Sequence, residues 1–164
     1  EEGNNRTGLN LFDQYYLSDK SDGIEIKLTR PEWVFSKSNS LRSKYPDDFE
    51  SVIHIRRGDR AANAGLPERD ISAEEYNRLT QAENILEKLR ILSCSKDNIY
   101  VMSDMQKGDP VIDSLNSSEF KFTYYFEYPE LYSLKKKNNY KLYILEEEIH
   151  RRAIFKVFNG HWLG

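Results

Sequence analysis

The sequence predicts an α/β fold in which helices cover both faces of a parallel β-sheet. Short apolar segments alternate with amphipathic helices from about residue 49 to 159, in the order β-α-β-α-β-α-β. The segments between the strands are long enough to return the chain to the start of the next parallel strand. Such connections are nearly always right-handed, so three layers are expected, with the sheet in the middle.

Four segments have strand character. The first is FESVIHIR at 49–56, which is nearly continuously apolar and β-branched, as expected for a strand covered on both faces. The other three are NIYVMSD at 98–104, FKFTYYFE at 120–127 and IFKVFN at 154–159. They are expected to form one sheet.

Two segments predict long helices. Ser72 and Glu75 form a capping box, and apolar residues then recur every three or four positions, which predicts one helix from Ala73 to Leu92. A second helix is expected over 139–153, where Leu142, Leu145, Ile149 and Ala153 share a face. His150 lies in its last turn, where a positive charge is favoured by the helix dipole.

Shorter signals complete the pattern. Asp109 is placed to cap a short helix that has Pro110 at its first position. The lysines at 135–137 are expected to lie in a solvated loop.

Residues 1–48 are expected to form an irregular N-terminal segment, and residues 49–164 the α/β domain. The segment GIEIKL at 23–28 alternates apolar and polar residues, which predicts a half-buried strand. Pro31 is suited to opening a short helix.

Composition narrows the class of protein. The 164 residues are 38% hydrophobic and 13% aromatic, which is enough for the core of a globular domain. A net charge of −3 disfavours nucleic acid as a partner, because phosphate contacts need a basic surface. No apolar run approaches the ~20 residues of a membrane span. Cys94 is the single cysteine, and no His, Asp and Glu spacing is typical of a metal site, so no metal cofactor is expected.

Polar residues gather where two of the predicted strands end. The first strand ends in HIRRGDR at 54–60, and the second ends in Ser103 and Asp104. Neighbouring parallel strands would bring both ends to the crevice where open α/β sheets bind ligands. Two guanidinium groups at such a place can make bidentate contacts with a phosphate or a diphosphate.

The segment HIRRGDR resembles the H-x-R-R-x-D motif of the fucosyltransferase superfamily, which includes α1,2-, α1,6- and protein O-fucosyltransferases. The segment NIYVMSD is similar to the second strand of that family, and the loop and helix between the two also match. The resemblance covers about residues 49–159. It implies a Rossmann-like domain, the nucleotide-binding half of a GT-B fold, in an inverting, metal-independent glycosyltransferase that uses GDP-fucose.

The resemblance implies roles for the loop that follows the first strand. Arg56 would contact the β-phosphate and stabilise the GDP leaving group, where negative charge builds as the bond to the anomeric carbon breaks. Arg57 would support the loop or add charge. Asp59 would hold the arginine loop in place.

The resemblance also implies that three further residues lie at the nucleotide. His54 would contact it near the ribose or the phosphate, and Asp104 would accept from the N–H groups of guanine, with Ser103 in support. The implied partners are a nucleotide-sugar donor and a glycan or protein acceptor. Cytoplasmic localisation is expected, or the Golgi or endoplasmic reticulum lumen if the source is eukaryotic.

The chain departs from the family pattern in two places. The family follows its last strand with a Ser-rich loop at the diphosphate, whereas this chain reads NGHWLG at 159–164, where Asn159, Gly160 and His161 are candidate replacements. A GT-B enzyme also needs a second domain for the acceptor, and residues 1–48 are too few to form it. The chain is therefore expected to be part of a longer enzyme.

Other interpretations of the same residues stay open. Arg56 and Arg57 can form structural ion pairs, His54 can be a core histidine, and Asp104 can cap the turn that follows it. A non-catalytic module that binds a nucleotide or phosphate through the same arginines is the alternative function. A histidine phosphatase is disfavoured, because its nucleophilic histidine directly follows an arginine.

Overall fold

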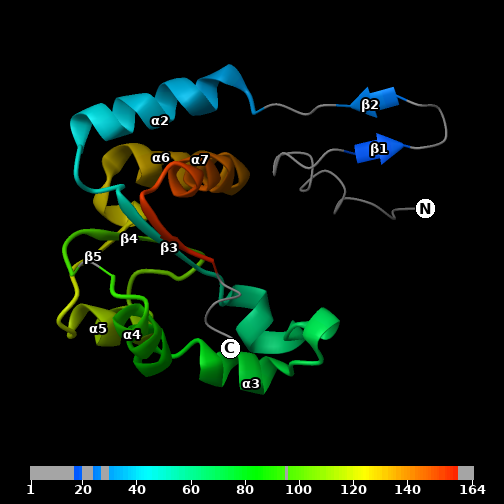
Figure 1. Ribbon diagram of the computed structural model, residues 1–164, viewed down its shortest axis with the longest axis vertical. Helices are drawn as coiled ribbons and strands as arrows, with labels where there is room; N and C mark the ends of the chain where they lie inside the picture. Colours follow the sequence, from blue (N-terminus) through cyan, green and yellow to red (C-terminus); the bar gives the residue numbers. More distant parts are fainter. Residues whose placement is uncertain (1–16, 20–23, 27–29, 95, 159–164) are drawn as a thin grey trace.

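The computed structural model describes residues 17–19, 24–26, 30–94 and 96–158. Its centre is a four-stranded sheet in which all neighbouring strands run parallel, in the order β5-β4-β3-β6 (Figure 1). The strands are β3 (Ser51–Ile55), β4 (Ile99–Ser103), β5 (Phe122–Tyr124) and β6 (Phe155–Val157). The predicted parallel α/β fold is confirmed.

The order of the strands reverses at β3. The chain steps from β3 to β4 to β5 and then returns to place β6 on the other side of β3. Ile55 is in register with Ser103 of β4, and Ser51 is in register with Phe155 of β6. This reversal is characteristic of Rossmann-like sheets, which bind ligands at the carboxyl ends of the strands beside it.

Helices cover both faces of the sheet (Figure 1). The first face is covered by α4 (Ala82–Ile91) and α5 (Pro110–Asn116), which pack on the inward side chains of β3 and β4. The second face is covered by α2 (Glu32–Lys44), α6 (Pro129–Lys137) and α7 (Asn139–Arg151). Side chains alternate along a strand, so Ile53 and Ile55 face α4 whereas Val52 faces α7.

The helix that follows Pro31 belongs to the second layer. α2 contributes Val34 and Leu41 to the core it shares with α7. A buried ion pair joins the residue just before Pro31 to α7, because Arg30 Nη1 lies 2.6 Å from Glu148 Oε2. The short helix predicted after Pro31 is confirmed.

The single helix predicted from Ala73 to Leu92 is wrong. The chain forms α3 (Ala73–Leu79) and α4, with a break at Thr80 and Gln81. The break has a physical cause in Arg57, whose guanidinium donates to the carbonyl and hydroxyl oxygens of Thr80. Together with a weaker contact to the carbonyl of Asn77, this cation supplies donors to backbone oxygens where the helix ends, as C-terminal cations commonly do.

The lysines predicted to lie in a solvated loop are the last turn of α6. Pro129 occupies the first position of that helix, and the lysines at 135–137 face the negative end of its dipole. The strand expected over 120–127 is shorter, because a 3-10 turn (Tyr125–Glu127) follows β5.

His150 is not a surface cation at the end of α7. It is 1% exposed, and its Nε2 lies 3.3 Å from the carbonyl oxygen of Val157. Burial lowers its pKa, which favours the neutral ring. The expected interaction of a charged His150 with the helix dipole is therefore wrong.

The remaining elements precede α2. β1 (Leu17–Asp19) and β2 (Ile24–Ile26) form an antiparallel pair, and β2 falls within the strand predicted at 23–28. Across the described ranges, no helix combines the length and the apolar character needed to cross a membrane.

Candidate functional site

A cavity of about 1250 Å³ opens at the carboxyl ends of β3 and β4, on the side of the sheet that α7 covers. Its walls come from the two strand ends, the π-helical turn η1 (Arg60–Ala64) and the start of α7. It brings together five of the six predicted site residues: His54, Arg56, Asp59, Ser103 and Asp104. Asn159, Gly160 and His161 lie outside the described residues.

The loop after β3 is anchored to the end of β4. The backbone N–H of Arg57 donates to Asp104 Oδ1 at 2.8 Å. A Cβ atom on Gly58 would lie 2.1 Å from Asp104 Oδ2, so a side chain there would displace the carboxylate. Gly58 is therefore required for this close approach, and Asp104 fixes the loop in place while lining the cavity.

The turn after β4 has its own cap. The Oγ of Ser103 accepts from the N–H of Met105 at 3.0 Å. Capping that turn, which was an open interpretation for Asp104, is thus done by Ser103.

Arg57 is directed at α3. Its Nη1 donates to the carbonyl oxygen of Thr80 at 2.6 Å, and its Nη2 donates to Asn77 Oδ1 at 2.5 Å. These contacts put the guanidinium at the negative end of a helix, where a cation is favoured. Of its two implied roles, the geometry supports the one that stabilises the loop.

Arg56 has the opposite orientation. Its side chain is 48% exposed and lines the cavity. Its Nη2 lies 3.3 Å from Asp59 Oδ1, an ion pair that fits the expectation that Asp59 holds this loop. The hydroxyl of Tyr76 donates to the backbone carbonyl of Arg56 and fixes the main chain. A guanidinium on a rigid backbone thus faces the cavity.

His54 forms part of the cavity wall and lies one residue before the carboxyl end of β3. Burial lowers its pKa to about 4, and the nearby His150 and Arg56 add to that effect. The ring is therefore neutral at neutral pH and offers hydrogen bonds without charge.

Glu146 was missed in the sequence analysis. It lies on α7, is 4% exposed, and contributes to the cavity lining. The hydroxyl of Tyr100 donates to its Oε1 at 2.5 Å. Burial raises the pKa of Glu146 to about 8, so the carboxyl is mostly protonated at neutral pH.

A signal for Glu146 was present in the sequence. It follows Leu142 by four residues and precedes Ile149 by three, so it falls on the apolar stripe of α7. A glutamate on such a stripe is buried, and a buried carboxyl needs a partner.

Lys135 lines the cavity as a further cation beside Arg56 and Arg60. Its Nζ donates to Asn139 Oδ1 at 2.6 Å, across the junction between α6 and α7. Its charge acts to lower the pKa of Glu146, although burial outweighs it.

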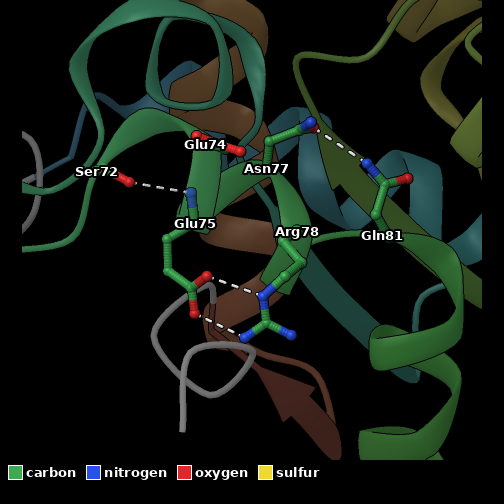
Figure 2. A pocket seen from close by; sticks show the side chains of 6 residues that line it. All are labelled: Ser72, Glu74, Glu75, Asn77, Arg78 and Gln81. Carbon is green, nitrogen blue, oxygen red and sulfur yellow. Dashed lines mark hydrogen bonds and ion pairs between the residues drawn. The ribbon is translucent and has the colours of Figure 1, made fainter.

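A smaller hollow of about 480 Å³ lies on α3 (Figure 2). The polar side chains there pair with one another: Arg78 with Glu75, and Gln81 with Asn77. Asn77 also accepts from Arg57, so this hollow lies behind the arginine that supports the loop. The larger cavity is the better candidate.

Among the residues that the structure describes, no three or more His, Cys, Asp or Glu side chains come together in a way that can hold a metal ion. Comparisons with family models, with curated proteins and with solved structures gave no match for this chain.

Proposed function

We propose that this chain is the nucleotide-sugar-binding domain of a glycosyltransferase. More particularly, we propose a fucosyltransferase-like enzyme of the GT-B class that binds GDP-fucose and transfers fucose, with inversion, to a glycan or protein acceptor. In this proposal the chain is one part of a longer enzyme, and another domain binds the acceptor.

The single observation that carries the proposal is that two neighbouring arginines have opposite orientations and different contacts. Arg57 is occupied by α3, while Arg56 faces a cavity at the carboxyl edge of a parallel sheet. Anionic ligands of such sheets bind at this edge. The ion pair with Asp59, at 3.3 Å, is long enough to be exchanged for a bidentate contact with a diphosphate.

The same geometry suits the chemistry of transfer. As the bond between the anomeric carbon and the diphosphate oxygen breaks, negative charge builds on the departing GDP. A cation fixed at that oxygen stabilises the transition state more than the ground state. The hydrogen bonds at the Arg56 carbonyl and the Arg57 N–H hold the loop still, so little reorganisation is needed.

Recognition of guanine requires an acceptor for two adjacent N–H groups. Asp104, the predicted reader, is already engaged with the loop after β3. Asp59 pairs with Arg56, and Glu146 offers a third carboxyl at the cavity, with one oxygen that accepts from Tyr100. We assign the guanine contact to Glu146, while Asp104 keeps the arginine loop in position.

The test is calorimetric titration of the chain with GDP, GDP-fucose, UDP and ADP. We expect binding of the guanosine ligands alone, weakened roughly ten- to hundredfold by Arg56→Ala, because a charged hydrogen bond to phosphate contributes about 1.5–3 kcal/mol. Arg78→Ala is the matched control: it removes an exposed arginine of the smaller hollow that is also paired with a carboxylate. Its titration should match the unmodified chain.

Equal binding of all four nucleotides, binding of none, or full affinity in Arg56→Ala would contradict the proposal. The non-catalytic module is separated by a second assay on the longer protein. An enzyme consumes GDP-fucose in the presence of acceptor glycans or proteins, whereas a module binds GDP and leaves the donor intact.

A further inference from the structure

We propose that a guanosine diphosphate sugar entering this cavity displaces a proton from the side chain of Glu146, so that donor binding is a proton-exchange reaction. This inference rests on the proposed function and concerns the regulation of the same site. The proton leaves for the solvent: the neutral acid and the donor become the carboxylate–donor complex and one hydrogen ion.

The position of the carboxyl is the first support. Glu146 is 4% exposed, yet it lines the cavity, and its Oε1 accepts from Tyr100 behind it. The hydrogen bond from Tyr100 fixes the orientation of the group, and a carboxylate has acceptor sites beyond the one that Tyr100 uses. Its burial disfavours the charged form in the absence of a partner.

The surrounding charges do not overcome that burial. The titratable groups that act on Glu146 or share its cavity come from every element around it: Tyr100 of β4, Tyr125 of η3, Lys135 of α6, Tyr140, Tyr143 and Glu147 of α7, His54 of β3, Arg56 and Asp59 after β3, Arg60 of η1, and Asp104 after β4. Lys135 favours ionisation and Glu147 opposes it. His54 is neutral near pH 7, because its pKa is about 4. The carboxyl of Glu146 therefore holds its proton in the empty cavity.

The chemistry of guanine provides the reason for proton loss. Its N1–H and N2–H groups are two adjacent donors. A neutral carboxylic acid offers them one acceptor and one opposing O–H, whereas a carboxylate accepts from both. Hydrogen bonds to the charged form stabilise it and lower its pKa. Guanine thus binds the ionised form of Glu146 and shifts the equilibrium towards it.

Linkage sets the expected pH dependence. Below the pKa of about 8 in the empty site, each unit of pH changes the ionised fraction about tenfold, so the dissociation constant falls about tenfold per unit as pH rises. Above that pKa the affinity levels off. Adenine and uracil nucleotides lack the paired donors and gain no such advantage.

The experiment is calorimetric titration with GDP-fucose between about pH 6 and about pH 8.5, in buffers with different ionisation enthalpies. GDP-fucose is preferred to GDP, because both of its phosphates are diesters and carry no proton that titrates in this range. We expect release of about one proton below pH 8 and the tenfold-per-unit slope. Glu146→Gln should bind more weakly, with a flat profile and no proton release, and the surface control Glu119→Gln should behave like the unmodified chain.

Tyr100→Phe provides a further readout. The hydrogen bond from Tyr100 lowers the pKa of Glu146, so its removal should move the pH profile upwards. A carbon NMR titration of the Glu146 carboxyl in the protein without nucleotide measures the pKa of this group directly. An ordinary pKa there, or tight binding of GDP-fucose without proton release, would overturn the linkage and leave the proposed function standing. Absence of guanosine-selective binding would overturn both.

Discussion

The two faces of the sheet are built differently. The core between the sheet and α4 and α5 consists of buried apolar and aromatic residues. The layer of α2, α6 and α7 also buries the ionisable groups Arg30, Glu146, Glu148 and His150. The cavity opens on this second side. One face thus buries an apolar core, while the other also buries ionisable groups, of which Glu146 lines the cavity and needs a partner for its polar atoms.

The difference begins within a single strand. Along β3, Ile53 and Ile55 face the apolar layer, whereas Val52 and His54 face the other side. One polar residue at an alternate position is enough to place a titratable group against α7 without disturbing the first face.

The largest expected effect is on the second face. Glu148 is fully buried and pairs with Arg30 and Arg151. Burial raises its pKa, but the hydrogen bonds from the two arginines outweigh this and hold the pKa below its ordinary value. Glu148→Ala removes the carboxylate 2.6 Å from the buried Arg30 and leaves the more distant Glu147 at 3.9 Å, so we expect a loss of about 3–5 kcal/mol. Urea unfolding measures it.

The control for that variant is Glu119→Ala, which removes an exposed partner of Arg90. Its stability should stay near that of the unmodified chain, because exposed ion pairs contribute little. If Glu148→Ala lost as little stability as Glu119→Ala, the buried ion pair would not be what holds the start of α2 against α7.

A variant in the apolar face tests whether the two faces differ in their response to pH. Leu89→Ala in α4 creates a cavity in a core without charge, and we expect it to cost about 2–5 kcal/mol. The loss of stability should be the same at pH 5 and pH 8, with a difference of about 0 kcal/mol, because the substitution exposes no group that titrates in this range. A strong pH dependence would mean that the two faces are coupled.

The two arginines should separate in stability as they do in position. Arg57→Ala removes the guanidinium that donates to the carbonyl oxygens of Asn77 and Thr80, which predicts a loss of about 2–3 kcal/mol. Arg56→Ala removes one partly exposed ion pair and should change stability by less than about 1 kcal/mol. Thermal unfolding of both variants measures the difference. Equal losses would contradict the assignment of Arg57 as the supporting residue.

Much of the fold was readable because its signals are local. Apolar strand segments and helices with one apolar stripe alternate along the sequence in the order that the structure has. Pro31, Asp109 and Pro110 lie at the starts of helices. The break at Thr80 was not readable, because it depends on Arg57, which is 23 residues away. Contacts of that kind are set by the packing of the sheet and leave no trace in local periodicity.

The site was partly readable for the same reason. Residues at the ends of adjacent parallel strands must lie together, which predicted Arg56 and Asp104 at one edge. The opposite orientations of Arg56 and Arg57 depend on α3, and the contribution of α7 depends on how its crossover packs. Glu146 is not predicted by a stripe that is defined by apolar residues alone, although it lies on that stripe.

The pH dependence of the second face is expected to be smaller than the effect of Arg57→Ala. The pKa of Glu146 is about 8 in the folded chain and ordinarily 4.5, so its contribution to stability is present below pH 4.5 and lost as pH rises towards 8. His54 acts in the other direction: its pKa falls from 6.5 to about 4, so stability is lost as pH falls through that range. Between pH 6.5 and 8 the slope therefore reports on Glu146 rather than on His54.

The unmodified chain should lose about 1–2 kcal/mol across that upper window, and Glu146→Gln should lose almost none, because an amide does not titrate there. Urea midpoints at several pH values measure both profiles. Parallel profiles for the two proteins would mean that Glu146 is ionised in the empty cavity. The same carboxyl would then bind guanine without exchanging a proton, and the second face would carry its buried charge without gaining a pH response from it.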